Sequence, residues 1–175
     1  MKNAASRVLN GVVLVVHNTR EPDREEWDEY LTAVATARAG LGRDFASFRQ
    51  LVITDGGVPS SAQRKAFAEV VRAGENVDKL KVAIISRSFS VRGIATALRW
   101  MGFPVRSFDP EQLAEAFACL AVSSSDAIAI CTAVGELCAT IDGSVRSAAR
   151  ISAYRRKLSS GSPGVRSRDS VAPTA

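Results

Sequence analysis

The side chains of this chain that could do chemistry lie where predicted strands end. His17, the only histidine, directly follows the apolar run of residues 12–16, while Asp55 and Ser88 follow two later apolar runs. In an open α/β sheet, side chains that follow strands meet at the carboxyl edge. A histidine oriented by a carboxylate can act as an acid or base for a serine nucleophile, either Ser88 or Ser60. This set would suit a hydrolase.

The sequence around these residues does not carry a recognised catalytic or cofactor motif. Neither serine lies in a G-x-S-x-G elbow, and Asp55-Gly56-Gly57 is not followed by the Lys-Ser/Thr pair of a phosphate-binding loop. The three cysteines lack the paired spacing of a zinc site. We therefore expect capping and hydrogen-bonding roles at the strand ends, with no enzyme activity, metal or cofactor. The alternative is a small-ligand-binding or hydrolytic domain that uses His17, Asp55 and Ser88.

The elements that position these residues alternate between strands and helices. Residues 82–85 form an apolar run typical of a strand buried on both faces, and apolar residues then recur at helical spacing as far as Met101. Asn10-Gly11 predicts a hairpin turn, and Ser60 followed by Gln63 predicts a capping box for a helix from about residue 61 to residue 73. Another helix should begin near Pro22, with an inner face of Trp27, Tyr30, Leu31, Val34 and Ala35.

The fold class follows from this order of elements. Residues 5–121 read as β-β-α-β-α-β-α-β-α, with the last helix opening at Asp109-Pro110. We expect an α/β domain with a mixed sheet of four to five strands covered by helices.

Residues 122–158 are predicted to be a helical extension, either one helix or two broken near Asp142-Gly143. Its apolar stripe has a near-heptad spacing, so it should pack on the domain or across a homodimer; its members are Ala127, Cys131, Val134, Cys138, Ile141 and Val145. The core over 5–121 is expected to fold without this extension. Residues 159–175 are polar and rich in Ser, Pro and Gly, which predicts a disordered basic tail.

Charge is distributed unevenly along the chain. Residues 143–175 hold seven basic residues and one acid, while the remainder of the chain is nearly neutral. Tyr154 alone is aromatic near the basic run, so the tail is poorly suited to stacking on nucleic acid, and we do not expect a nucleic-acid partner. We expect neither a leader nor a membrane span, since no apolar run approaches about 18 residues. These expectations favour the cytoplasm.

The order of elements resembles the anti-sigma-factor antagonist (STAS) domain and its SpoIIAA-like relatives over roughly residues 5–121. The resemblance lies in VLNGVVLVVH, in KVAIIS leading into VRGIATAL, and in FPVRSFDPEQLAEAF. It implies a bacterial signalling module that recognises a protein, such as a regulator or kinase-like protein, rather than an enzyme. In phosphoregulated members a serine at the start of a helix is modified. Ser60 falls on that position, with Pro59 and Ala62 replacing the aspartate and glycine of the family motif.

The resulting prediction is a non-enzymatic regulatory or adaptor module. Its partner would bind at the strand ends and at the helix that starts after Ser60, and Ser60 is the candidate phosphorylation site. The candidate contact residues are Asp55, Ser60, Ser61, Arg64, Arg87 and Ser88. A homodimer through the C-terminal helix is a further expectation.

Overall fold

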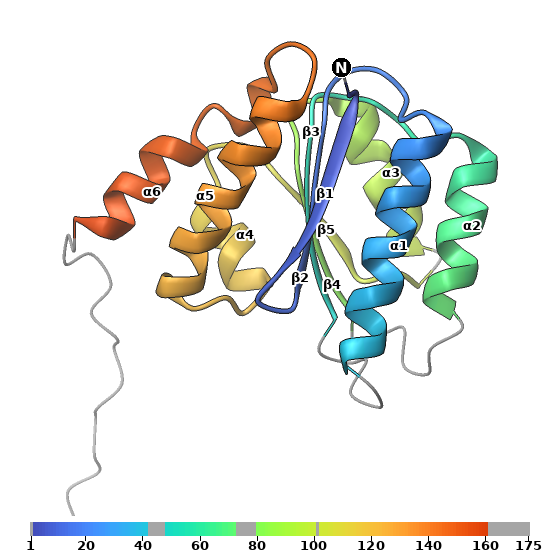
Figure 1. The fold of residues 1–175 in the computed structure, drawn as a ribbon, viewed down its shortest axis with the longest axis horizontal. Helices are drawn as coiled ribbons and strands as arrows, with labels where there is room; N and C mark the ends of the chain where they lie inside the picture. The colour runs from blue at the N-terminus through green and yellow to red at the C-terminus, as the bar shows by residue number, and fades with distance from the viewer. Residues whose placement is uncertain (1, 42–47, 73–79, 101, 161–175) are drawn as a thin grey trace, which may run out of the picture.

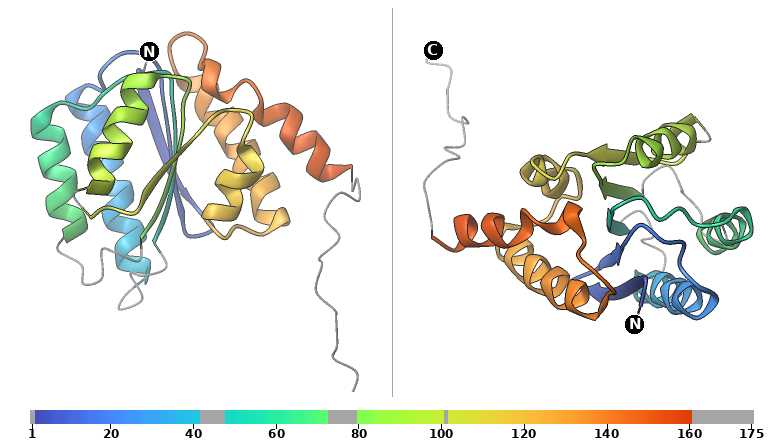
Figure 2. Two further views of the ribbon diagram at one scale, coloured as in Figure 1. Left: turned by 180° about the vertical axis from the view of Figure 1, so that it is seen from behind. Right: turned by 90° about the horizontal axis from the view of Figure 1, so that it is seen from above.

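The computed structural model describes residues 2–41, 48–72, 80–100 and 102–160. It is an α/β fold in which a five-stranded mixed sheet lies between two layers of helices (Figures 1 and 2). The predicted fold class is therefore confirmed. Most of the predicted disordered tail, residues 161–175, lies outside the described residues.

The sheet begins with the predicted hairpin. β1 (Ala4–Leu9) pairs antiparallel with β2 (Val12–His17). Asn10 and Gly11, which form the turn, have φ values of 50° and 71°. Asparagine and glycine tolerate positive φ better than other residues, which explains why this dipeptide makes the turn. Every residue of β2 is buried, as a central strand requires.

The rest of the sheet is parallel. β3 (Arg49–Thr54), β4 (Lys81–Ile85) and β5 (Val105–Phe108) follow β2 in spatial order. The connections run through α1 (Arg24–Leu41), α2 (Ser61–Arg72) and α3 (Phe89–Trp100), and Figure 1 shows these three helices on one side of the sheet. Because each helix returns the chain to the same end of the sheet, the carboxyl ends of β2 to β5 share one edge.

The inner face of α1 differs from the prediction at one position. Tyr30 and Val34 are buried, but Ala35 is exposed and Ala37 is buried instead. Ala35 directly follows Val34 and so lies about 100° around the helix from it, whereas Ala37 lies three positions on and shares its face.

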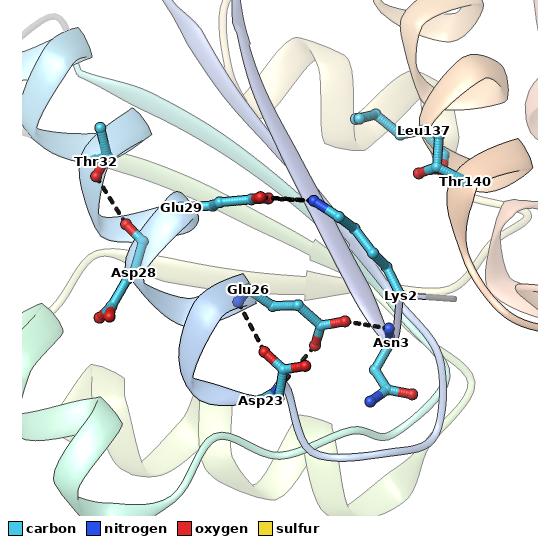
Figure 3. Close-up of polar contacts among 9 residues, drawn as sticks. All are labelled: Lys2, Asn3, Asp23, Glu26, Asp28, Glu29, Thr32, Leu137 and Thr140. Carbon is cyan, nitrogen blue, oxygen red and sulfur yellow. Dashed lines mark hydrogen bonds and ion pairs between the residues drawn. The ribbon is translucent and has the colours of Figure 1, made fainter.

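Glu26 joins the start of α1 to the start of β1 (Figure 3). Its buried carboxylate accepts hydrogen bonds from the backbone N–H groups of Asn3 and Asp23, and Asp23 accepts one from the Glu26 N–H at 2.9 Å. This is a reciprocal capping box. Lys2 and Glu29 form an ion pair at 2.6 Å beside it, so Lys2 and Asn3 are held against α1.

The second helical layer comes from the C-terminal part of the chain. It contains α4 (Leu113–Cys119), α5 (Ser124–Thr140) and α6 (Ile151–Ser159), with the short 3₁₀ helix η3 (Arg146–Ala148) between α5 and α6. Of the two predicted alternatives, one helix or two broken near Asp142-Gly143, the structure has the broken form. The predicted helix start at Asp109-Pro110 is wrong by several residues, because residues 109–112 form a hydrogen-bonded turn before α4.

The apolar stripe of the extension is buried within its own chain. It joins β1, β2 and β3 in one core cluster, in which Cys138 is partly buried and the other five predicted members are buried: Ala127, Cys131, Val134, Ile141 and Val145. This stripe motivated the expected homodimer, and here it packs in cis. Since α5 covers one face of the sheet, we now expect deletion of residues 123–175 to expose that core.

Among the described helices, none is by itself long and apolar enough to cross a membrane. The helices α4 and α5 meet the length and composition required only as a pair, and the chain bends by 115° between them.

Candidate functional site

The carboxyl edge of the sheet brings the predicted site residues into one neighbourhood. In the strand register, His17 lies beside Thr54, while Ile53 pairs with Ile85 and Ile85 with Phe108. Asp55, Ser86 and the segments that follow therefore line one edge. The prediction that these strand ends meet is confirmed.

His17 is buried and bonded within the fold. Its Nδ1 lies 3.2 Å from the hydroxyl of Thr54, which also accepts a hydrogen bond from the Gly56 N–H. The side chain is 5% exposed, and this burial lowers its pKa to about 4, although the Asn18 backbone and the Asp55 charge act in the opposite direction. The imidazole is therefore neutral near pH 7 and serves as a hydrogen-bonding group inside the sheet edge.

Asp55 binds the C-terminal segment. Its two carboxylate oxygens accept hydrogen bonds from the backbone N–H groups of Arg146 (2.5 Å) and Ser147 (2.7 Å), at the start of η3. The Ser147 hydroxyl donates to the Thr54 carbonyl at 2.9 Å. Asp55 thus fastens the segment between α5 and α6 to the end of β3.

Close packing around Gly57 leaves no room for a side chain. A Cβ atom at this position would lie 2.2 Å from the Arg20 carbonyl oxygen and 2.8 Å from His17 Nδ1. The Gly57 N–H donates to the Asn18 carbonyl at 3.0 Å, which brings the two loops together. Glycine is required here because only a residue without a side chain lets the two backbones approach so closely.

Ser60 is the N-cap of α2, as predicted. Its hydroxyl accepts a hydrogen bond from the Gln63 N–H at 3.2 Å, and the Gln63 side chain accepts one from the Ser60 N–H at 2.8 Å. Gln63 also donates to the Pro22 carbonyl, which ties the start of α2 to the loop before α1. Ser61 and Arg64 are exposed, and Arg64 bonds the Pro59 carbonyl.

The segment before α3 lies against the loop after β3. A Cβ on Gly56 would be 3.5 Å from the Ser88 hydroxyl, which is itself 2.7 Å from the Ser90 hydroxyl. Arg87 is exposed and pairs with Glu111 at 3.0 Å.

Phe89, the first residue of α3, is 87% exposed. The guanidinium of Arg92 lies 5.6 Å from the centre of its ring and is also paired with Asp109. Reasoning from the sequence did not single out Phe89. Its exposure could have been predicted from its position, because it lies two positions before Val91 and therefore on the opposite side of α3 from the buried stripe.

The hydrolase set of His17, Asp55 and Ser88 is not assembled. Each side chain has a different partner: Thr54 for His17, the start of η3 for Asp55, and Ser90 for Ser88. Among the side-chain hydrogen bonds of the described residues, none joins any two members of the set. His17 and Asp55 are joined only through their backbones, where the Asp55 N–H donates to the His17 carbonyl at 3.3 Å.

Among the described residues, neither metal-ligating side chains nor thiols form a separate site. Within the described parts of the chain there is no group of three or more His, Cys, Asp or Glu side chains that could hold a metal ion. Burial raises the pKa of both Cys131 and Cys138 to about 11, so these thiols are protonated at neutral pH. They pack as small apolar side chains in the core.

Three comparisons, with family models, with curated proteins and with solved structures, found no match to this chain. The resemblance to the STAS family therefore stays a prediction.

Proposed function

We propose that this chain is a non-enzymatic regulatory module of the cytoplasm that binds a protein partner at the carboxyl edge of its sheet. The binding surface consists of the N-cap of α2 and the start of α3, with Ser60, Arg64, Arg87, Ser88 and Phe89 as its contact residues. The observation that carries the proposal is the 87% exposure of Phe89 at this edge.

An exposed phenylalanine flanked by arginines has the composition of a binding hot spot. Phe89 lies between Arg87 and Arg92, and isolated aromatic anchors of this kind gain free energy when a partner buries them. The ring would enter an apolar pocket on the partner, while the arginines would lie at the polar rim.

The charge of the same edge favours an acidic partner. Neither α2 nor α3 has an acidic residue in its first turn, whereas α1 has Glu25 and Glu26 there. The first turns of these two helices thus supply no carboxylate of their own to the positive ends of the helix dipoles. Arg64 and Lys65 add positive charge, and neither takes part in the ion pairs found among the described residues.

In this proposal Ser60 is the switch of the surface. Phosphorylation would replace its capping hydroxyl with a dianionic group at the N-terminus of α2, one turn from Arg64. Such a phosphate would neutralise the positive edge and repel an acidic partner. Binding should therefore be weaker when Ser60 is modified.

The test is affinity capture from the native cytosol with matched variants. Phe89→Ala removes the proposed anchor, and Trp100→Ala removes an aromatic residue of equal exposure at the other end of the same helix. A partner that binds this edge should lose roughly 30-fold in affinity with Phe89→Ala and should be unaffected by Trp100→Ala. Equal retention by both variants, or loss with Trp100→Ala alone, would overturn the proposal.

The switch is tested with Ser60→Asp and Ser60→Asn. Both residues are good N-caps, so α2 should begin normally in each, and only the aspartate adds charge. We expect the partner to bind Ser60→Asn like the wild type and Ser60→Asp more weakly. Equal binding by the two variants would contradict the charge mechanism.

A further inference from the structure

A cavity of about 390 Å³ lies between the sheet and the α1–α3 layer. Its walls come from all five strands and from α1, α2 and α3, and they are mainly apolar, with Val15, Val52 and Val82 on the sheet side and Phe67 and Leu98 on the helix side. Pockets for small molecules have volumes of about 300 to 1,000 Å³. This cavity therefore has room for a small ligand.

Two buried polar atoms in residues that line this cavity have no hydrogen-bond partner. The side chain of Gln50 is 3% exposed; its Nε2 donates to the Tyr30 hydroxyl at 2.8 Å, while its Oε1 is unpaired. Trp27 Nε1 is also buried and unpaired. A buried polar atom without a partner costs free energy, so each marks a place where a bonding group fits.

These two atoms specify the chemistry of the group that would satisfy them. Gln50 Oε1 needs a donor, and Trp27 Nε1 needs an acceptor. A hydroxyl group can do both, and the surrounding walls suit a hydrocarbon body.

Most of the lining is uncharged, which favours a neutral ligand, although Glu26, Arg64 and Lys65 also belong to it. Burial lowers the pKa of His17 to about 4 and raises that of Tyr30, so both are neutral at pH 7. Glu26 also contributes to the lining, and its carboxylate already accepts the N–H groups of Asn3 and Asp23.

We propose that this cavity binds a small, largely apolar alcohol, with its hydroxyl between Gln50 and Trp27 and its hydrocarbon part under α2. The exposed residues Arg64 and Lys65 also line the cavity, so it reaches the surface beside α2. This mouth shares Arg64 with the proposed protein-binding surface, but the ligand proposal does not depend on that surface.

The test compares decanol with its isomer nonyl methyl ether. The two have the same atoms, but the ether oxygen can only accept. Binding is followed by the fluorescence of Trp27 in a Trp100→Phe background, which leaves one tryptophan, and by calorimetry. We expect saturable binding of decanol, tighter than that of the ether by about tenfold, the effect of one buried hydrogen bond.

Three variants locate the site. Gln50→Leu removes the acceptor and should bring the ratio of alcohol to ether affinity close to one. Ala68→Phe fills the cavity from α2 and should abolish binding, whereas Ala118→Phe, on an exposed face of α4 in the opposite layer, should leave it unchanged.

The two probes are also compared in the protein that keeps Gln50 and Ala68. That comparison is valid whether or not the Gln50→Leu and Ala68→Phe variants fold. If neither probe binds saturably, as expected for a cavity that holds only water, the proposal is overturned. Equal affinity for the two probes would overturn the role of the hydroxyl.

Discussion

Asp55 should contribute more to stability than to binding, and Asp55→Ala tests this directly. The substitution removes both acceptors for the N–H groups that begin η3. The consequences differ at the two positions, because Arg146 is exposed and Ser147 is completely buried. Water can replace the carboxylate at Arg146 but not at Ser147.

The expected loss follows from this difference. A hydrogen bond to a charged group contributes about 1.5 to 3 kcal/mol, and a buried N–H left without a partner costs about as much. Counting mainly the Ser147 bond, we expect Asp55→Ala to lower the free energy of unfolding by about 2 to 3 kcal/mol. For a chain of this size that corresponds to a fall in Tm of about 4 to 12 °C. Asp55→Asn keeps one acceptor and should lose about half as much.

Urea denaturation followed by circular dichroism measures the loss, with the slope m checked for constancy. Asp28→Ala is the matched control, because its carboxylate is 65% exposed and pairs with Arg24 at 3.9 Å, a contact worth at most about 0.5 kcal/mol. Hydrogen exchange of the Ser147 amide should also become faster in Asp55→Ala alone. A midpoint for Asp55→Ala equal to those of Asp28→Ala and the wild type would refute the assigned role.

Three further predictions concern the sheet edge and the start of α1. Gly57→Ala should lower the free energy of unfolding by more than about 2 kcal/mol, because its Cβ would lie 2.2 Å from the Arg20 carbonyl oxygen. The control in the same denaturation assay is Gly40→Ala, which has open space in α1 and should be neutral or stabilising by up to about 1 kcal/mol. Glu26→Ala leaves two backbone N–H groups without their acceptor and should lower the free energy of unfolding by about 2 kcal/mol. Glu26→Gln should lower it by about half as much, and an equal loss for both variants would contradict the capping role. His17 has a pKa of about 4 in the fold against 6.5 for the free side chain. Its contribution to the free energy of unfolding is therefore complete above pH 6.5 and falls by up to about 3 kcal/mol as the pH drops through 4. NMR titration of this single histidine should give the low midpoint, and His17→Gln should flatten the dependence of stability on pH over this range.

Local signals explain why much of the fold could be predicted. The turn at Asn10-Gly11 depends on the conformational freedom of two neighbouring residues, and the cap of α2 depends on Ser60 and Gln63, three residues apart. Both interactions form within one turn of chain, so their residue types are sufficient to indicate them. The apolar runs and helical spacings are equally local, and together they determine the α/β class.

The candidate site could be predicted only in part. Strand order placed His17 and Asp55 at one edge, but the partner of Asp55 lies 91 residues further along the chain. Phe89 could have been found from its position opposite the buried stripe of α3. The cavity could not be found in this way, because in the sequence Gln50 is only a polar residue in an apolar strand. The space beside it depends on how the helices α1 to α3 pack on the sheet.

The sequence alone thus determined the order of the elements, the hairpin, the capping box of α2 and the set of strand ends that form the edge. These features depend on backbone preferences and on side-chain periodicity over a few residues. The tertiary structure alone decided that α5 buries its stripe against β1 and β2, that Asp55 holds η3, and that a cavity remains beneath α2. These outcomes depend on contacts between distant segments, whose free energies are settled by how the layers pack together.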